Sequence, residues 1–132
     1  MTPQSSVVTA GTNATSVQYN ALRADALLGL KVLTTVTDGA TDTFDLSLGN
    51  VFHTTLGGNR TLALSNPTDN QIFTLILKQD ATGSRTVTWW AGIVWVGGVT
   101  PTLTTAVNKR DIFTFIVEST GVYLGFVSGQ NI

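Results

Sequence analysis

The chain has 132 residues and a formal net charge of -1, which suits one domain with a modest hydrophobic core. A near-neutral chain lacks the basic surface that binds nucleic acid, and the glycines and Pro101 within residues 86–108 argue against membrane insertion, so neither partner is expected. The absence of cysteine excludes disulfides and thiolate metal sites. Charged residues make up only 11% of the sequence, against roughly 25% in an average globular domain. We therefore expect either association with another chain or a surface of uncharged polar residues.

The N-terminal part of the sequence divides into an extended arm and one short helix. Residues 1–14 are small and polar and lack the basic and apolar regions of a signal peptide, so they are expected to form an arm. Residues 15–29 have a helix signature, because Thr15 and Gln18 have the spacing of a capping box and Gly29 stands where a C-terminal cap belongs. The apolar residues of this helix share one face that is expected to pack against other elements: Val17, Ala21, Ala24 and Leu28.

From residue 30 onward the apolar residues recur with a period of two, which is typical of β-strands. Strands are expected at residues 31–37, 43–48, 51–56, 60–64, 71–79, 85–90, 93–96, 111–119 and 121–127. Turns rich in Gly, Asn and Asp separate them, and residues 57–59 are expected to form a hairpin turn. No repeat of solenoid length and no βαβ alternation is visible. The sequence therefore predicts a mainly β domain over residues 30–132, an antiparallel β-sandwich or a jelly roll.

The segment Ser84–Leu103, SRTVTWWAGIVWVGGVTPTL, is unusually apolar. Alternation puts Trp89 and Trp90 on opposite faces of one strand, and Trp95 and Val96 on opposite faces of the next. A strand in a two-layer sandwich has one apolar face and one wet face, so the second apolar face needs a cover. A loop or helix of the same chain, another copy of the chain, or a bound sugar could supply it. The candidate interface or binding platform consists of Trp89, Trp90, Ile93, Trp95 and Val96.

No arrangement of residues in the sequence is typical of an active site. The only histidine, His53, points away from the face of Phe52 in an expected strand and is interpreted as a structural or surface residue. Asp38, Asp42 and Asp45 are close in sequence, but their spacing does not fit an EF-hand calcium loop. Nucleotide-binding, protease and hydrolase motifs do not occur. We therefore expect a protein that is not an enzyme, with no catalytic residue, cofactor or metal site.

Two stretches of the sequence resemble segments of known proteins. AGTNATSVQYNALRADAL, residues 10–27, is similar to a short helical segment of small phage structural proteins. Residues 45–118 resemble a β domain that recurs in phage tail fibres and other virion components. The motifs that carry this second resemblance are NRTLAL, ILKQDATGSRTVTW, VWVGG, PTLT and RDIFTF.

The resemblance implies a virion protein, assembled in the host cytoplasm, that forms a homotrimer or a larger assembly. With only an arm, a helix and one β domain, the chain is expected to be a capsid-decoration subunit that residues 1–14 attach to a major capsid or tail protein. The alternative is a tail-fibre or spike module that binds a host receptor or surface glycan through its tryptophan-rich strands. The resemblance brings no catalytic residues with it.

Overall fold

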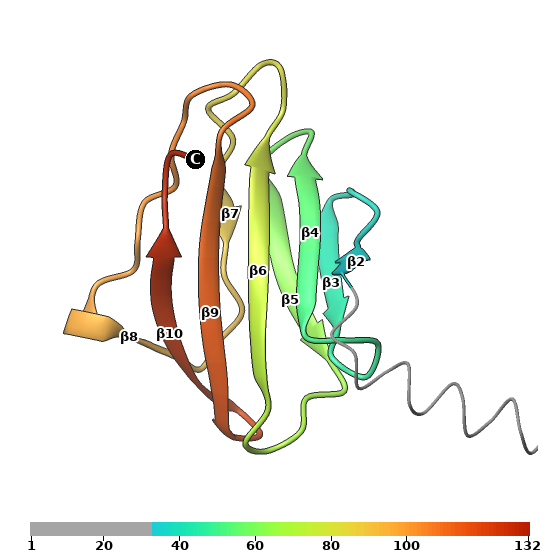
Figure 1. Ribbon diagram of the computed structural model, residues 1–132, viewed down its shortest axis with the longest axis vertical. Coiled ribbons are helices and arrows are strands. Elements are labelled where there is room, and N and C mark those ends of the chain that lie inside the picture. Colours follow the sequence, from blue (N-terminus) through green and yellow to red (C-terminus); the bar gives the residue numbers. More distant parts are fainter. Residues whose placement is uncertain (1–32) are drawn as a thin grey trace, which may run out of the picture. The chain divides into compact units, whose positions relative to one another are not determined.

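The computed structural model describes residues 33–132, which form two β-sheets packed face to face (Figure 1). The mainly β sandwich expected from the sequence is thereby confirmed. The larger sheet has the strand order β2-β4-β6-β9-β10-β8. Its strands are β2 (Leu33–Thr35), β4 (Val51–Leu56), β6 (Ile72–Gln79), β9 (Arg110–Ser119), β10 (Val122–Gly129) and β8 (Ile93–Trp95).

The smaller sheet has the order β3-β5-β7 and lies behind the larger one in Figure 1. Its strands are β3 (Thr41–Asp45), β5 (Arg60–Ser65) and β7 (Val87–Thr88). A short 3-10 helix, η1 (Val96–Gly98), follows β8. The predicted arm at residues 1–14 and the predicted helix at residues 15–29 lie outside the described residues, as do the helix-packing residues Val17, Ala21, Ala24 and Leu28.

From β2 to β7 the chain alternates between the two sheets, so each strand pairs with the next strand but one. The pairs β2–β4, β4–β6, β3–β5 and β5–β7 are all parallel, and β8 also runs parallel to β10. Only β6–β9 and β9–β10 are antiparallel among the described strands. The predicted antiparallel arrangement is therefore wrong for this first part of the domain, which is a flattened coil with two layers. Residues 57–59 are likewise not a hairpin turn, because they connect β4 in one sheet to β5 in the other.

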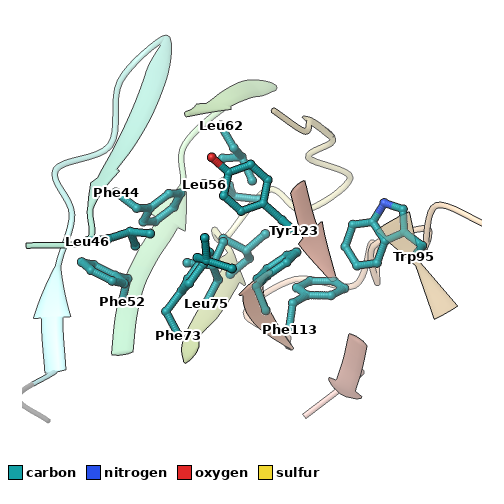
Figure 2. Packing of buried hydrophobic residues seen from close by; sticks show 13 residues of the cluster. Phe44, Leu46, Phe52, Leu56, Leu62, Phe73, Leu75, Trp95, Phe113 and Tyr123 are labelled. Carbon is teal, nitrogen blue, oxygen red and sulfur yellow. The ribbon is translucent and has the colours of Figure 1, made fainter. Parts of the chain in front are cut away.

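The core lies between the two sheets and is rich in phenylalanine and leucine. The larger sheet contributes alternate residues, such as Phe73, Leu75 and Leu77 of β6, while the smaller sheet contributes Phe44 and Leu62. Figure 2 shows side chains from both layers meeting in this space. The alternation expected for residues 71–79 is confirmed, because the same strand turns its other side chains away from the core.

Candidate functional site

The outer face of the larger sheet is the side that points away from the core, and an apolar row crosses four of its strands. Ile72 of β6 pairs with Ile116 of β9, which pairs with Leu124 of β10, which in turn pairs with Val94 of β8. Ile72 and Val94 are each 56% exposed. No described segment crosses in front of this face in Figure 1. Among the described residues, this row is therefore an apolar surface open to a partner.

The charges on the outer face are separated along β9. The side chains that this strand turns outward are, in order, Arg110, Ile112, Thr114, Ile116 and Glu118. Lys78 of β6 pairs with Arg110, so the basic character extends across two strands at that end. The pKa of His53, on neighbouring β4, is lowered by burial and by the positive charges of Arg110 and Lys78. The outer face thus has a basic end, an apolar middle and an acidic end.

The three tryptophans lie on the inner side of the larger sheet and join an aromatic cluster with Phe73, Phe113, Phe115 and Tyr123. The ring centroids of Trp89 and Trp95 are 5.0 Å apart and nearly perpendicular, and Trp90 lies 4.9 Å from Phe115. Trp95 is only 8% exposed. Edge-to-face contacts of this kind stabilise aromatic cores by about 0.5–1.5 kcal/mol each beyond area burial. The three indoles therefore help to hold the domain together.

The expectation that Trp89 and Trp90 lie on opposite faces of one strand is wrong. β7 ends at Thr88, so neither tryptophan belongs to a strand, and the backbone turns at residues 91–92 before β8 begins. Alternation holds only while the chain stays extended and paired. Both indoles consequently reach the aromatic cluster, and their rings contact each other with centroids 5.7 Å apart.

A pocket of about 160 Å³ opens beside Trp89, and we refer to it below as the pocket. Its two walls are residues 85–89 and residues 100–105. The apolar lining consists of Val87, Trp89, Pro101 and Leu103. The polar lining consists of Arg85, Thr86, Thr100, Thr102 and Thr105. The lining thus combines four apolar residues with four threonines and one arginine.

One buried side chain, that of Gln79, holds both walls of the pocket. Its Nε2 donates hydrogen bonds to the carbonyl oxygens of Arg85 (2.9 Å) and Thr104 (2.8 Å). Its Oε1 accepts a hydrogen bond from the backbone N–H of Arg85 (2.8 Å). The buried carboxylate of Asp111 accepts another from the N–H of Thr104 (2.6 Å). Residues 100–105 have no regular secondary structure, yet these bonds fix their backbone.

A sequence family described as "putative phage tail fibre C-terminal domain" matches residues 34–122, which is more than half of the chain. The chain belongs to this family. No curated protein and no solved structure is significantly similar to it. The resemblance to phage virion proteins is thereby confirmed, and the protein is a virion-associated structural protein of the tail-fibre type.

The residues proposed as an interface or platform in this tail-fibre domain occupy two environments. Trp89, Trp90 and Trp95 belong to the aromatic cluster, and Ile93 packs half-buried against it. Val96, at the start of η1, is 64% exposed. Their role in binding a partner stays a prediction. The sequence reasoning missed two features, the outer face and the pocket wall at residues 100–105.

The three aspartates near the start of the tail-fibre domain each have a protein partner. Asp38 forms an ion pair with Arg60 (2.6 Å), and this bond holds the pKa of the carboxyl below its usual value. Asp42 accepts hydrogen bonds from Gly39 N–H and the Thr54 hydroxyl, while burial raises its pKa. Asp45 accepts hydrogen bonds from Ser47 and Asn66. Within residues 33–132, no three acidic, histidine or cysteine side chains gather as metal ligands would, and no helix is long and apolar enough to span a membrane.

Proposed function

We propose that the chain is a non-enzymatic domain of a phage tail fibre that associates with copies of itself through the outer face of the larger sheet. The family match supports the tail fibre over the capsid-decoration role expected from the sequence. The single observation that supports self-association is the apolar row of Ile72, Ile116, Leu124 and Val94, uncovered by any described residue.

The outer face is complementary to itself when two copies meet with their β9 strands antiparallel. In that arrangement Arg110 of one copy faces Glu118 of the other, Ile112 faces Ile116, and Thr114 lies on the two-fold axis. Such a contact buries the apolar middle of the face and pairs its charged ends. The homotrimer implied by the phage resemblance remains the alternative symmetry, and the mass of the assembly distinguishes the two.

The energy of this contact comes mainly from the apolar row. Complete burial of an Ile or Val side chain is worth about 1.5–3 kcal/mol, so a side chain that is already half covered contributes about 1 kcal/mol more on association. A lysine at such a position must instead remove its charge from water. We therefore expect Ile72→Lys to weaken association by about 2 kcal/mol or more, roughly thirtyfold.

Sedimentation equilibrium of the full chain tests the proposal. The wild type should be oligomeric at micromolar concentration, and Ile72→Lys should shift the mass toward the monomer. Val99→Lys is the matched control, because Val99 is 72% exposed but lies after η1 and outside the outer face. A wild type that stays monomeric, or equal losses from both variants, would contradict self-association through this face.

A charge exchange tests the antiparallel arrangement separately. Glu118→Lys should weaken association, because it places two basic groups opposite each other, and the double variant Glu118→Lys with Arg110→Glu should restore it. A trimeric mass without any such restoration would support three-fold packing instead.

Binding of a host-surface component is a second candidate function, favoured by the pocket beside Trp89. A glycan is the receptor class that the tryptophan-rich segment suggested. The pocket is lined by Trp89, which is only partly buried, and by four threonines, whereas Trp95 is buried and neither Trp90 nor Trp95 lines the pocket.

A further inference from the structure

We propose that the pocket binds one neutral hexopyranose ring, either as a free sugar or as the end of a glycan. The proposal rests on the second candidate function above, host-surface binding, and is independent of the outer face. The pocket lies between residues 85–89 and residues 100–105, and no residue of the outer face lines it.

The size of the pocket limits the ligand to one ring. Its volume is about 160 Å³, and an engineered apolar protein cavity of about 150 Å³ holds one benzene ring. Sites for larger ligands usually measure about 300–1,000 Å³. A longer glycan would therefore place one residue in the pocket and extend into solvent.

The lining matches the two surfaces of a pyranose. One face of such a ring carries C–H groups, which pack well on apolar and aromatic side chains, here Val87, Trp89, Pro101 and Leu103. The edge of the ring carries hydroxyl groups. Four threonines are among the lining residues, and a threonine hydroxyl can both donate and accept hydrogen bonds: Thr86, Thr100, Thr102 and Thr105.

The charge of the pocket favours a neutral ligand. Arg85 is the only charged residue in the lining, and its Nε and Nη2 donate to the carboxylate of Asp80, at 2.7 Å for the shorter bond. This pair neutralises the guanidinium and fixes its orientation. Within residues 33–132 the hydrogen bonds of this guanidinium come from Nε and Nη2 and all go to Asp80.

The pocket is formed before any ligand arrives. Gln79 bonds to both walls, and in the second wall Asp111 accepts a hydrogen bond from Thr104 N–H while Gln130 donates one to the carbonyl of Thr102. The buried amide and carboxylate fix an irregular surface segment. Because that segment is already ordered, less conformational entropy is lost on binding. Fixed loops of this kind are where binding residues concentrate.

Ligand-observed NMR and tryptophan fluorescence of the full chain test the proposal. The probes are the methyl glycosides and the free reducing forms of glucose, galactose and mannose, with glucuronate as the charged counterpart. We expect saturable binding of at least one neutral sugar in the millimolar range, as is usual for a ligand of about a dozen heavy atoms. Binding of a methyl glycoside identifies a glycan end, and binding of the reducing form alone identifies a free sugar.

Two pocket variants and one control variant locate the site. Thr86→Phe should fill the pocket and weaken binding at least tenfold, while Thr88→Phe, two residues further along the chain and outside the pocket lining, should leave it unchanged. The isosteric double variant Thr100→Val with Thr102→Val removes two hydroxyls without adding bulk, and it should weaken binding about fivefold. Thermal melting confirms that each variant is folded.

The proposal is overturned if no neutral sugar binds, if only glucuronate binds, or if sugar binding survives both pocket variants. The sedimentation measurements above are made on the same samples. Loss of sugar binding with an intact oligomer would refute the pocket alone, and sugar binding by a monomer would refute self-association alone.

Discussion

Replacing Gln79 with leucine should cost the domain a large part of its stability, although leucine has a similar volume. Gln79 is 2% exposed and makes three hydrogen bonds, two to Arg85 and one to Thr104. Each bond is worth about 1 kcal/mol net, and the backbone groups that lose their partner pay about 1–3 kcal/mol more where water does not replace it. Since both walls lie near the surface, part of that cost is recovered by hydration. We expect a loss of about 2–4 kcal/mol in the free energy of unfolding.

Urea unfolding followed by tryptophan fluorescence measures this loss, and the melting temperature should fall by roughly 10 °C. Gln130→Leu is the control, because its exposed side chain bonds to Thr102 O and Asp111 and its removal should cost about 1 kcal/mol or less. A loss below 1 kcal/mol for Gln79→Leu would show that the two walls keep their positions without this side chain, and the reasoning would fail.

The variant Gln79→Glu adds a pH dependence of known sign. A carboxylate at this position would face the two carbonyl oxygens of Arg85 and Thr104, so its pKa should be raised in the folded state. A raised pKa gives stability that is present below the unfolded value and is lost as the pH rises through the folded value. The stability difference from the wild type should therefore shrink in acid. A difference that does not change with pH would contradict the position assigned to the carbonyl groups.

Three further predictions concern the aromatic cluster and an ion pair. Trp95→Ala should lower the free energy of unfolding by about 3–5 kcal/mol, because Trp95 is 8% exposed. A smaller oligomer with an unchanged melting temperature would instead identify Trp95 as an interface residue. Gly125→Ala should lower the free energy of unfolding, measured with urea, by about 1–3 kcal/mol, because a Cβ there would lie 2.7 Å from Trp95 Cε3. A variant as stable as the wild type would show that the indole of Trp95 can shift to make room. The hydrogen bonds from Arg85 lower the pKa of Asp80 from 3.8 to about 2, so stability that is present above pH 3.8 should be lost as the pH falls through about 2. Asp80→Asn should lack that loss of stability in acid when urea midpoints are measured over a pH series. Identical pH profiles for the variant and the wild type would show that the pair of Asp80 and Arg85 does not contribute to the pH dependence.

The strands and their inward faces could be predicted from the sequence, but their pairing could not. Alternation in residues 71–79 identifies the side that faces the core, as Phe73 and Leu75 confirm. It carries no information on which strand lies next to it, because parallel and antiparallel neighbours need the same apolar side. Two glycines at residues 57–58 consequently indicated a hairpin, where the chain passes from one sheet to the other.

The coil could not be predicted from the sequence, because its turns differ in length. In the larger sheet the paired positions of successive turns are Leu33, Val51 and Thr74, and in the smaller sheet they are Thr41, Thr61 and Thr88. These spacings along the chain are unequal, so no fixed period appears in the sequence. The geometry repeats from turn to turn while the sequence does not.

The sequence does contain evidence of the pocket, in two polar residues at inward strand positions. Gln79 and Asp111 both occupy inward positions of strands whose other inward residues are apolar. A polar group at such a position is costly unless a fixed partner satisfies it. Here the two residues share one partner in an irregular segment, since Gln79 donates to the carbonyl of Thr104 and Asp111 accepts from its N–H. An inward polar residue at a strand end therefore marks a loop that the core holds in place, and in this domain that loop forms a wall of the pocket.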